Sequence, residues 1–190
     1  RMHWPASAKN GRLMVRKNEY TTQQNLTVIL NMQSRHYELF DTVDKTIAEL
    51  GIKVAATLFD RALREGNPVR FITNGCTDPD EKQPIVTGEA ADRDHITSLL
   101  RILAGLRMKN VKDFRVLLED TSSDIFNSEV VIITAYLTVE ISRLADRIAS
   151  EGNDVHVVLL DTVYERGSEP RHADLYVLSD RMRAEAEKLA

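Results

Sequence analysis

A short apolar run near the start of the chain constrains its fold more than any other stretch. Residues 26–30 (LTVIL) are mostly apolar and rich in β-branched side chains, and mostly polar residues follow at 31–35, a pattern typical of a buried strand in an α/β sheet. A second run of the same character spans residues 130–134 (VVIIT). Each run leads into a helix-like segment. We therefore predict two neighbouring strands whose loops, at 31–35 and 134–136, meet where open α/β sheets bind ligands.

The rest of the chain alternates between strand-like and helix-like segments. Further strands are predicted at residues 69–73, 155–160 and 175–178, with a short antiparallel edge strand at 83–88, and helices at 37–65, 91–107, 111–119, 138–151 and 179–190. This alternation is typical of an α/β fold with a doubly wound, mostly parallel sheet of Rossmann-type topology. The right-handed crossover rule places the strand at 26–30 between those at 69–73 and 130–134. An extra outer strand is predicted within residues 1–24.

Length, charge and cysteine content narrow the class of protein. A chain of 190 residues favours one domain, since domains commonly run to ~100–200 residues. Its net charge of -4 gives no reason to expect nucleic-acid binding, and a single cysteine, Cys76, favours a reducing compartment. No apolar run approaches the ~20 residues needed to cross a bilayer. Because the chain begins with Arg rather than Met, we expect it to be a piece of a longer or processed protein.

Nucleophilic chemistry has one candidate pair, Ser34 and His36, which stand two residues apart near the predicted start of a helix. A hydrolase needs a nucleophile with a base in reach, but no G-x-S-x-G elbow surrounds Ser34, and helix capping is the simpler interpretation. Cys76 with a distant histidine is a weaker candidate. His156 is expected in the core or on a sheet face, and the histidines show no metal-ligand spacing. We assign no catalytic residue.

The opening residues resemble those of a known prokaryotic family. Arg1-Met2-His3-Trp4, followed by SAK at 7–9 and GRLMVR at 11–16, is similar to the start of the bacterial and archaeal family called "domain of unknown function 58". The strand at 69–75 and the helix at 95–106 are similar to two further family patterns, so the resemblance covers essentially the whole chain. It implies an N-terminal family segment with the outer strand at 1–24, and a von Willebrand factor A-like domain at 25–190.

The resemblance also implies a setting for the protein. Members of this family usually carry transmembrane helices before the segment seen here, and they are often encoded near MoxR-type AAA+ ATPases. They have no settled biochemical activity. The implied role is the assembly or remodelling of other proteins, with a MoxR-type ATPase as candidate partner. The implied location is the cytoplasmic side, as the soluble part of a membrane-anchored protein.

Von Willebrand factor A domains usually bind Mg²⁺ at a metal-ion-dependent adhesion site. The site combines an Asp-x-Ser-x-Ser motif, a Thr from a later loop and an Asp after the fourth strand. The resemblance aligns these positions with Asn31, Gln33, Arg35 and Ala135, and places Thr87 near the Thr position. Hard divalent ions need oxygen ligands, carboxylates above all, and the Arg35 guanidinium would repel a cation. We therefore expect a degenerate site with no metal and no cofactor.

We predict from these patterns a non-enzymatic protein–protein interaction module. Its contact surface is expected at the carboxyl edge of the sheet, with Trp4 as a further candidate, and is formed by Asn31, Gln33, Ser34, Arg35, Thr134, Ala135 and Tyr136. Arg and Tyr are favoured at interface hot spots. Two alternatives stay open, a divalent-metal-dependent, adhesion-type binding domain and a small hydrolase or nucleotide-binding enzyme in the same fold.

Overall fold

The computed structural model describes residues 25–161 and 164–178. These residues form a six-stranded sheet in the order β4-β3-β1-β6-β7-β8, and a second sheet of two short strands, β2 and β5. The strands are β1 (Asn25–Leu30), β2 (Phe40–Asp41), β3 (Val69–Thr73), β4 (Ile85–Val86), β5 (Lys109–Asn110), β6 (Ser128–Thr134), β7 (Asp154–Leu159) and β8 (Asp174–Val177). The helices are α2 (Lys45–Glu65), α3 (Arg93–Gly105), α4 (Phe114–Ser122) and α5 (Val139–Ser150).

Strand β1 lies in the middle of the large sheet. It pairs in parallel with β3 on one side and β6 on the other, so that Leu26 stands in register with Val69 and Glu129. The parallel pairing continues through β7 and β8, and β4 adds an antiparallel edge. The predicted fold, a doubly wound and mostly parallel sheet with the 26–30 strand between its two expected neighbours, is confirmed.

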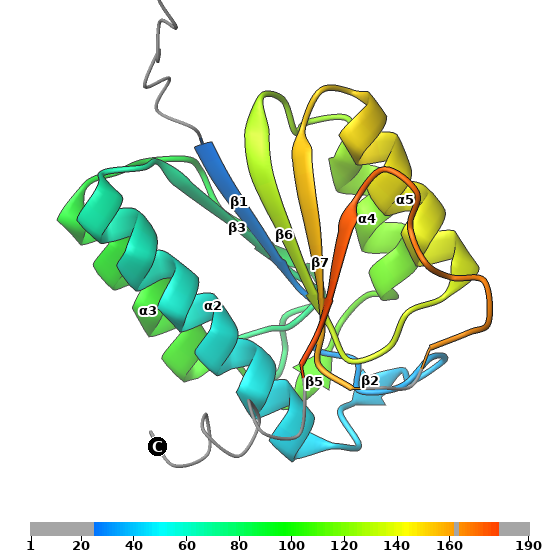
Figure 1. Cartoon of the computed structure of the whole chain (residues 1–190). Coiled ribbons are helices and arrows are strands. Elements are labelled where there is room, and N and C mark those ends of the chain that lie inside the picture. Colours follow the sequence, from blue (N-terminus) through cyan, green and yellow to red (C-terminus); the bar gives the residue numbers. More distant parts are fainter. Residues whose placement is uncertain (1–24, 162–163, 179–190) are drawn as a thin grey trace, which may run out of the picture.

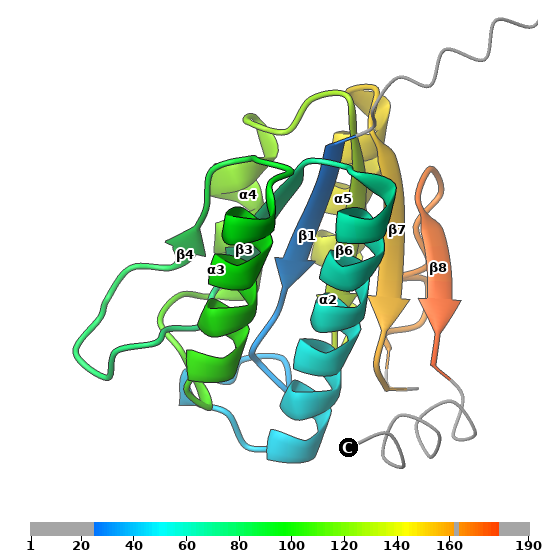
Figure 2. The same cartoon turned by 90° about the vertical axis from the view of Figure 1, so that its left-hand side faces the viewer.

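Helices cover both faces of this sheet, α2 and α3 on one face and α4 and α5 on the other (Figures 1 and 2). Side chains alternate along β1, so Val28 belongs to the core under α2 and α3 while Ile29 belongs to the core under α4 and α5. Burial on both faces explains why this strand is mostly apolar and does not alternate between apolar and polar residues. On the α2 side, the fully buried ring of Phe71 meets Phe59 edge-on, with 5.4 Å between centroids.

The helix predicted over residues 37–65 starts later than its apolar spacing suggested. Helix α2 begins only after its N-cap, Asp44, and residues 35–43 form a loop that contains β2. Tyr37 and Phe40 in this loop have φ of 66° and 73°, values that lie outside a right-handed helix. The prediction was wrong at this end because exposed apolar side chains of the loop happen to continue the apolar spacing of the helix.

The other elements agree more closely with the sequence. Helices α3 and α5 lie inside their predicted ranges, and the predicted edge strand is β4. The helix predicted at 111–119 is α4, which lies further along the chain because β5 pairs with β2 and because Asp113 caps α4. The outer strand predicted in residues 1–24, Trp4 within it, and the helix predicted at 179–190 lie outside the described residues.

Candidate functional site

The loops after β1 and β6 meet at the carboxyl edge of the sheet. The Nδ2 atom of Asn31 donates a hydrogen bond to Thr134 Oγ1 at 3.0 Å. That hydroxyl in turn donates to the carbonyl oxygen of Tyr136 at 2.8 Å. The two loops are therefore joined by the side chains at the ends of their strands, at the place where doubly wound sheets commonly bind ligands.

Gln33 is fully buried and links this edge to α4. Its Oε1 atom accepts hydrogen bonds from the backbone amide of Phe114 at 2.8 Å and from the hydroxyl of Tyr136 at 3.3 Å. Its Nε2 atom donates to the carbonyl oxygen of Glu38. Burial raises the pKa of Tyr136 to about 12, so its hydroxyl stays protonated at neutral pH and keeps its proton to donate.

Asn74 completes the network. It follows β3 directly and is fully buried. Its Oδ1 atom accepts from the amide of Met32 at 2.8 Å, and its Nδ2 atom donates to Asn31 Oδ1 at 3.2 Å and to the Lys112 carbonyl at 3.1 Å. Because β3 neighbours β1 in the sheet, the first polar residue after β3 could have been expected at the same edge.

The amide oxygens at this edge already accept hydrogen bonds. Asn31 Oδ1 accepts from the Gln33 backbone amide at 2.9 Å as well as from Asn74, and Gln33 Oε1 accepts the two bonds from Phe114 and Tyr136. A cation bound to either oxygen would have to displace these donors. Each displaced donor would then be left buried without a partner, which costs free energy.

Glu38 has its carboxylate inside the loop, with only 9% of the residue exposed. The backbone amides of Ser34 and Val43 donate to its two oxygens, and the Ser34 hydroxyl lies 3.0 and 3.1 Å from them. The amide of Asp44 donates to Ser34 Oγ at 2.9 Å. These bonds satisfy a buried acidic group and fold the loop back on itself between β1 and α2.

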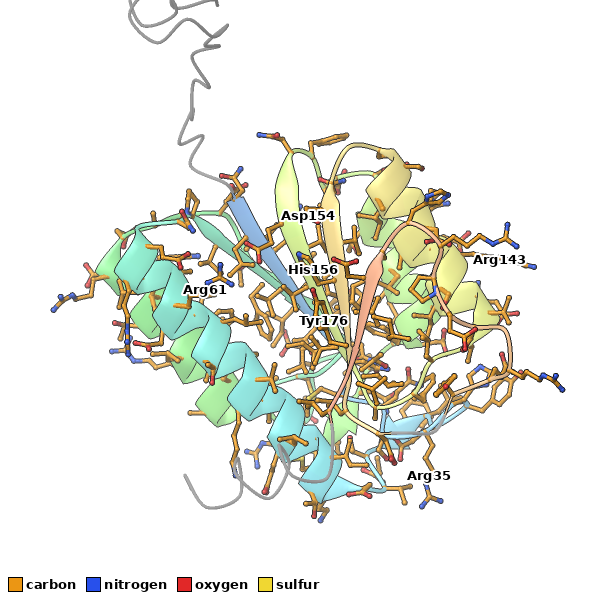
Figure 3. The ribbon with its side chains drawn as sticks, viewed as in Figure 1. Arg35, Arg61, Arg143, Asp154, His156 and Tyr176 are labelled. Carbon is orange, nitrogen blue, oxygen red and sulfur yellow. The ribbon has the colours of Figure 1, made fainter. Side chains whose placement is uncertain are left out.

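The side chains that this loop turns outward are largely apolar, and we call residues 35–43 the apolar loop. Four of its large side chains are exposed by between 60% and 82%, namely Tyr37, Leu39, Phe40 and Val43. The exposed Arg35 side chain points away from the sheet at the same end (Figure 3). The ring of His36 stacks on Tyr37 with 3.7 Å between centroids. The carboxyl edge therefore presents an aromatic and aliphatic surface next to a cation.

The structure separates the predicted contact residues into one exposed and several buried side chains. Arg35 is exposed, whereas the others among the described residues are buried, namely Asn31, Gln33, Ser34, Thr134, Ala135 and Tyr136. Trp4 lies outside the described residues. The buried side chains shape the edge. The side chains that reach solvent belong to the apolar loop, part of which the sequence analysis had placed in a helix.

Ser34 and His36 make separate contacts. Ser34 Oγ is engaged with the Glu38 carboxylate and the Asp44 amide, while the His36 ring stacks on its neighbouring tyrosine. Asp44, rather than Ser34, caps α2. Cys76 is buried, and this burial raises the pKa of its thiol, so less of it is present as the nucleophilic thiolate.

Two other side chains noted in the sequence lie away from the loops after β1 and β6. Thr87 Oγ1 accepts from the backbone amide of Phe71 at 2.9 Å, which places it beside the middle of β3. His156 lies on a face of β7, 3.5 Å from a carboxylate oxygen of Asp154 and 3.5 Å from one of Asp174 (Figure 3). His156 is thus a sheet-face histidine.

Hollows open beside the apolar loop. One of about 520 Å³ is lined in part by Arg35, His36 and Tyr136. Another of about 440 Å³ is lined in part by Phe40 and Asn110. Both lie next to exposed side chains of the loop, so a molecule that binds the loop can also enter a hollow.

A family model agrees with the resemblance carried by the opening residues. The family described as "Protein of unknown function DUF58" matches residues 1–188. The chain belongs to the DUF58 family. No curated protein matches this DUF58 chain in sequence. Within its described part, none of the helices is both long and apolar enough to cross a membrane.

Solved structures identify the fold of this DUF58 chain. It is similar to the SpRpn10 VWA domain, with 12% identity, a TM-score of 0.51 and coverage of 88% of this chain and 95% of that chain. It is also similar to the pilus adhesin SpaC from Lactobacillus rhamnosus GG, with 10% identity, a TM-score of 0.53 and coverage of 89% and 30%. An aerotolerance-related membrane protein from Bacteroides fragilis NCTC 9343 matches at 10% identity with a TM-score of 0.46, covering 87% and 96%. The DUF58 chain has the von Willebrand factor A-like fold.

Proposed function

We propose that this domain is a non-enzymatic protein-interaction module that binds its partner through the apolar loop. The observation that carries the proposal is a loop that buries Glu38 but exposes Tyr37, Leu39 and Phe40. Apolar side chains that gather on a surface with a polar rim mark interaction sites. Because hydrogen bonds to the buried groups already fix the loop, little conformational entropy is lost when a partner binds.

The proposal includes a degenerate metal-ion position. The oxygens of Asn31 and Gln33 accept hydrogen bonds from other protein groups. Ala135 supplies no ligand atom in its side chain, and Arg35 brings a positive charge. In this account hydrogen bonds join the loops where a metal ion and its carboxylate ligands would otherwise do so. The divalent-metal-dependent, adhesion-type alternative makes the opposite prediction, which is tested in the Discussion.

The partner that we propose is a MoxR-type AAA+ ATPase on the cytoplasmic side of a membrane. Membership of the DUF58 family supports this choice, because members are often encoded near such ATPases and usually carry transmembrane helices upstream. The chemistry of the surface supports a protein in general. A loop with four exposed apolar side chains on a chain of net charge -4 suits a protein partner better than a polyanion.

A binding assay with the MoxR-type ATPase encoded in the same genome tests both parts of the proposal. Isothermal titration calorimetry measures the affinity of the purified domain and of single variants. Leu39→Ala and Phe40→Ala should each weaken binding by about 1–3 kcal/mol, as expected for interface hot spots. Both side chains are exposed in the free domain, so these variants should fold normally.

The matched control is Phe126→Ala. Phe126 is 65% exposed and lies just before the start of β6, whereas the 134–136 loop follows the end of that strand. The Phe126→Ala variant should bind the ATPase with the same affinity as the unmodified domain. Equal affinities for the loop variants and the unmodified domain would move the interface elsewhere, while a domain that does not bind the ATPase at all would rule out this partner.

A further inference from the structure

The side-chain amide of Asn110 is buried with only one of its two ends satisfied. Asn110 belongs to β5 and is 2% exposed. Its Oδ1 atom accepts a hydrogen bond from the backbone amide of Phe40 at 3.2 Å, and this bond fixes which end of the amide is the oxygen. Its Nδ2 atom has no hydrogen-bond partner among the described residues. A buried N–H donor without an acceptor is unfavourable, so a bound molecule that supplies an acceptor here would satisfy the amide.

Asn110 lines the hollow of about 440 Å³ beside the apolar loop. Phe40, whose ring is exposed on that loop, lines the same hollow, as does Pro79 from the segment after β3. A hollow of this size is in the range of known ligand pockets. The site therefore combines one buried donor with an apolar wall that continues into the surface proposed for the partner.

The charges around this hollow cancel. Asp80 and Glu81 bring two negative groups, and Lys82 and Lys109 bring two positive ones. An anion would bond to Asn110 but would meet the two carboxylates, and a cation would meet a hydrogen-bond donor and two ammonium groups. A neutral acceptor with an apolar neighbour fits best. The peptide carbonyl group next to an apolar side chain has both properties.

We propose that this hollow binds a short segment of a partner polypeptide, with a peptide carbonyl oxygen of the segment accepting from Asn110 Nδ2 and an adjacent apolar side chain packed on Phe40 and Pro79. The proposal rests on the proposed function, because it names the chemistry that the same surface recognises. It adds a buried directional contact to the apolar loop. Such a contact favours a segment that can place a carbonyl at one position.

The test uses peptides selected from a random library displayed on phage, with the unmodified domain as bait. Asn110→Asp keeps an oxygen that accepts from the Phe40 amide but replaces the donor with a carboxylate oxygen. It should weaken binding of the selected peptides about tenfold or more in fluorescence anisotropy. Asn127→Asp is the matched control, with the same change in charge at an exposed residue before β6. It should leave their affinity unchanged.

A second measurement needs no variant. In ¹⁵N-labelled unmodified domain, the selected peptides should shift the side-chain NH₂ signal of Asn110, and acetate or inorganic phosphate at the same concentration should not. Peptides that bind Asn110→Asp equally well and leave this signal unmoved would overturn the proposal, as would a signal shifted by the anions alone. Peptides that no longer bind Leu39→Asp but bind Asn110→Asp as they bind the unmodified domain would overturn this proposal and leave the proposed function standing. Peptides that bind Asn110→Asp more weakly but bind Leu39→Asp normally would support the hollow as a peptide site and contradict the apolar loop as the contact surface.

Discussion

The strands of the large sheet and the apolar loop bury opposite kinds of side chain. Ile29 in β1 and Phe71 in β3 are fully buried, whereas the loop buries Glu38 and exposes Tyr37 and Phe40. The strands are held by apolar burial, and the loop is held by hydrogen bonds to a few enclosed polar groups. This difference shows how the carboxyl edge can be ordered without a hydrophobic core of its own. Its apolar side chains then remain available to a partner.

The largest effect is expected from two phenylalanines, one in each region. Phe71→Ala removes a fully buried ring packed on Phe59, and it should lower the free energy of unfolding by about 3–5 kcal/mol. Phe40→Ala removes a ring that is 70% exposed, and it should change that free energy by less than about 0.5 kcal/mol. Urea unfolding followed by circular dichroism measures both. A Phe40→Ala variant as unstable as Phe71→Ala would mean that the loop has a core like that of the sheet.

The next effect concerns the enclosed carboxylate. Glu38→Ala removes the acceptor of the Ser34 and Val43 amides, so the free energy of unfolding should fall by about 1.5–3 kcal/mol. Hydrogen exchange at those two amides should also become faster, because the loop opens locally. Glu119→Ala is the control. Its carboxylate forms an exposed ion pair with Arg115, which contributes at most about 0.5 kcal/mol, and equal destabilisation by both variants would contradict a special role for Glu38.

A smaller effect at neutral pH is expected from Tyr136→Phe, which removes the hydroxyl that donates to Gln33 and should lower stability by about 1 kcal/mol. Burial raises the pKa of Tyr136 to about 12 in the folded state, above the value of about 10 expected in the unfolded state. The unfolded state therefore releases the proton first as the pH rises. The stabilisation is complete below about pH 10 and is lost between about pH 10 and 12.

Urea unfolding of Tyr136→Phe and the unmodified domain near pH 7, 9 and 11 checks this dependence. The advantage of the unmodified domain should hold at the two lower values and shrink or reverse at the highest. The other tyrosines are common to both proteins, so their titration cancels in the difference. A difference that stays constant with pH would show that Tyr136 ionises as readily in the folded state as in the unfolded state.

The large sheet could be predicted because its physics leaves a simple pattern in the sequence. Strands β1 and β6 are buried on both faces, so consecutive apolar residues fill positions 28–30 and 130–133. The order of the strands then follows from the handedness of their crossovers. The start of α2 could not be found in this way. Leu39, Phe40 and Val43 continue its apolar spacing although they are exposed, and only the Asp44 cap marks the true boundary.

The carboxyl edge could be predicted only in part. Polar residues that follow neighbouring parallel strands were expected to meet, and Asn31 does contact Thr134. Glu38 was missed because a buried acid has the same appearance in a sequence as a solvated one until its donors are known. Asn110 was missed for a related reason. Its importance depends on a donor left unpaired after β2 and β5 have paired, which no local pattern records.

The smallest expected effect is that of divalent metal on the unmodified domain. Mg²⁺ needs near-octahedral oxygen ligation and usually at least one carboxylate. Asn31 and Gln33 offer amide oxygens that already accept hydrogen bonds. A ligand bound only by the native state raises stability by RT ln(1 + [L]/Kd). Millimolar Mg²⁺ or Mn²⁺ should therefore leave the Tm where it stands in EDTA, as measured by differential scanning calorimetry.

A variant with the metal-ion motif restored is the positive control for the expected absence of a metal effect on the unmodified domain. Asn31→Asp and Ala135→Asp, combined with Gln33→Ser and Arg35→Ser, supply two carboxylates and two hydroxyls at one edge. Without metal the variant should melt below the unmodified domain, because two acids are enclosed there and the bonds from Phe114 and Tyr136 to Gln33 are lost. Millimolar Mg²⁺ should raise its Tm, since the cation offsets both carboxylates. If the unmodified domain were itself stabilised by Mg²⁺, the hydrogen-bonded edge would be a cation site after all, and the adhesion-type alternative would replace the metal-free module.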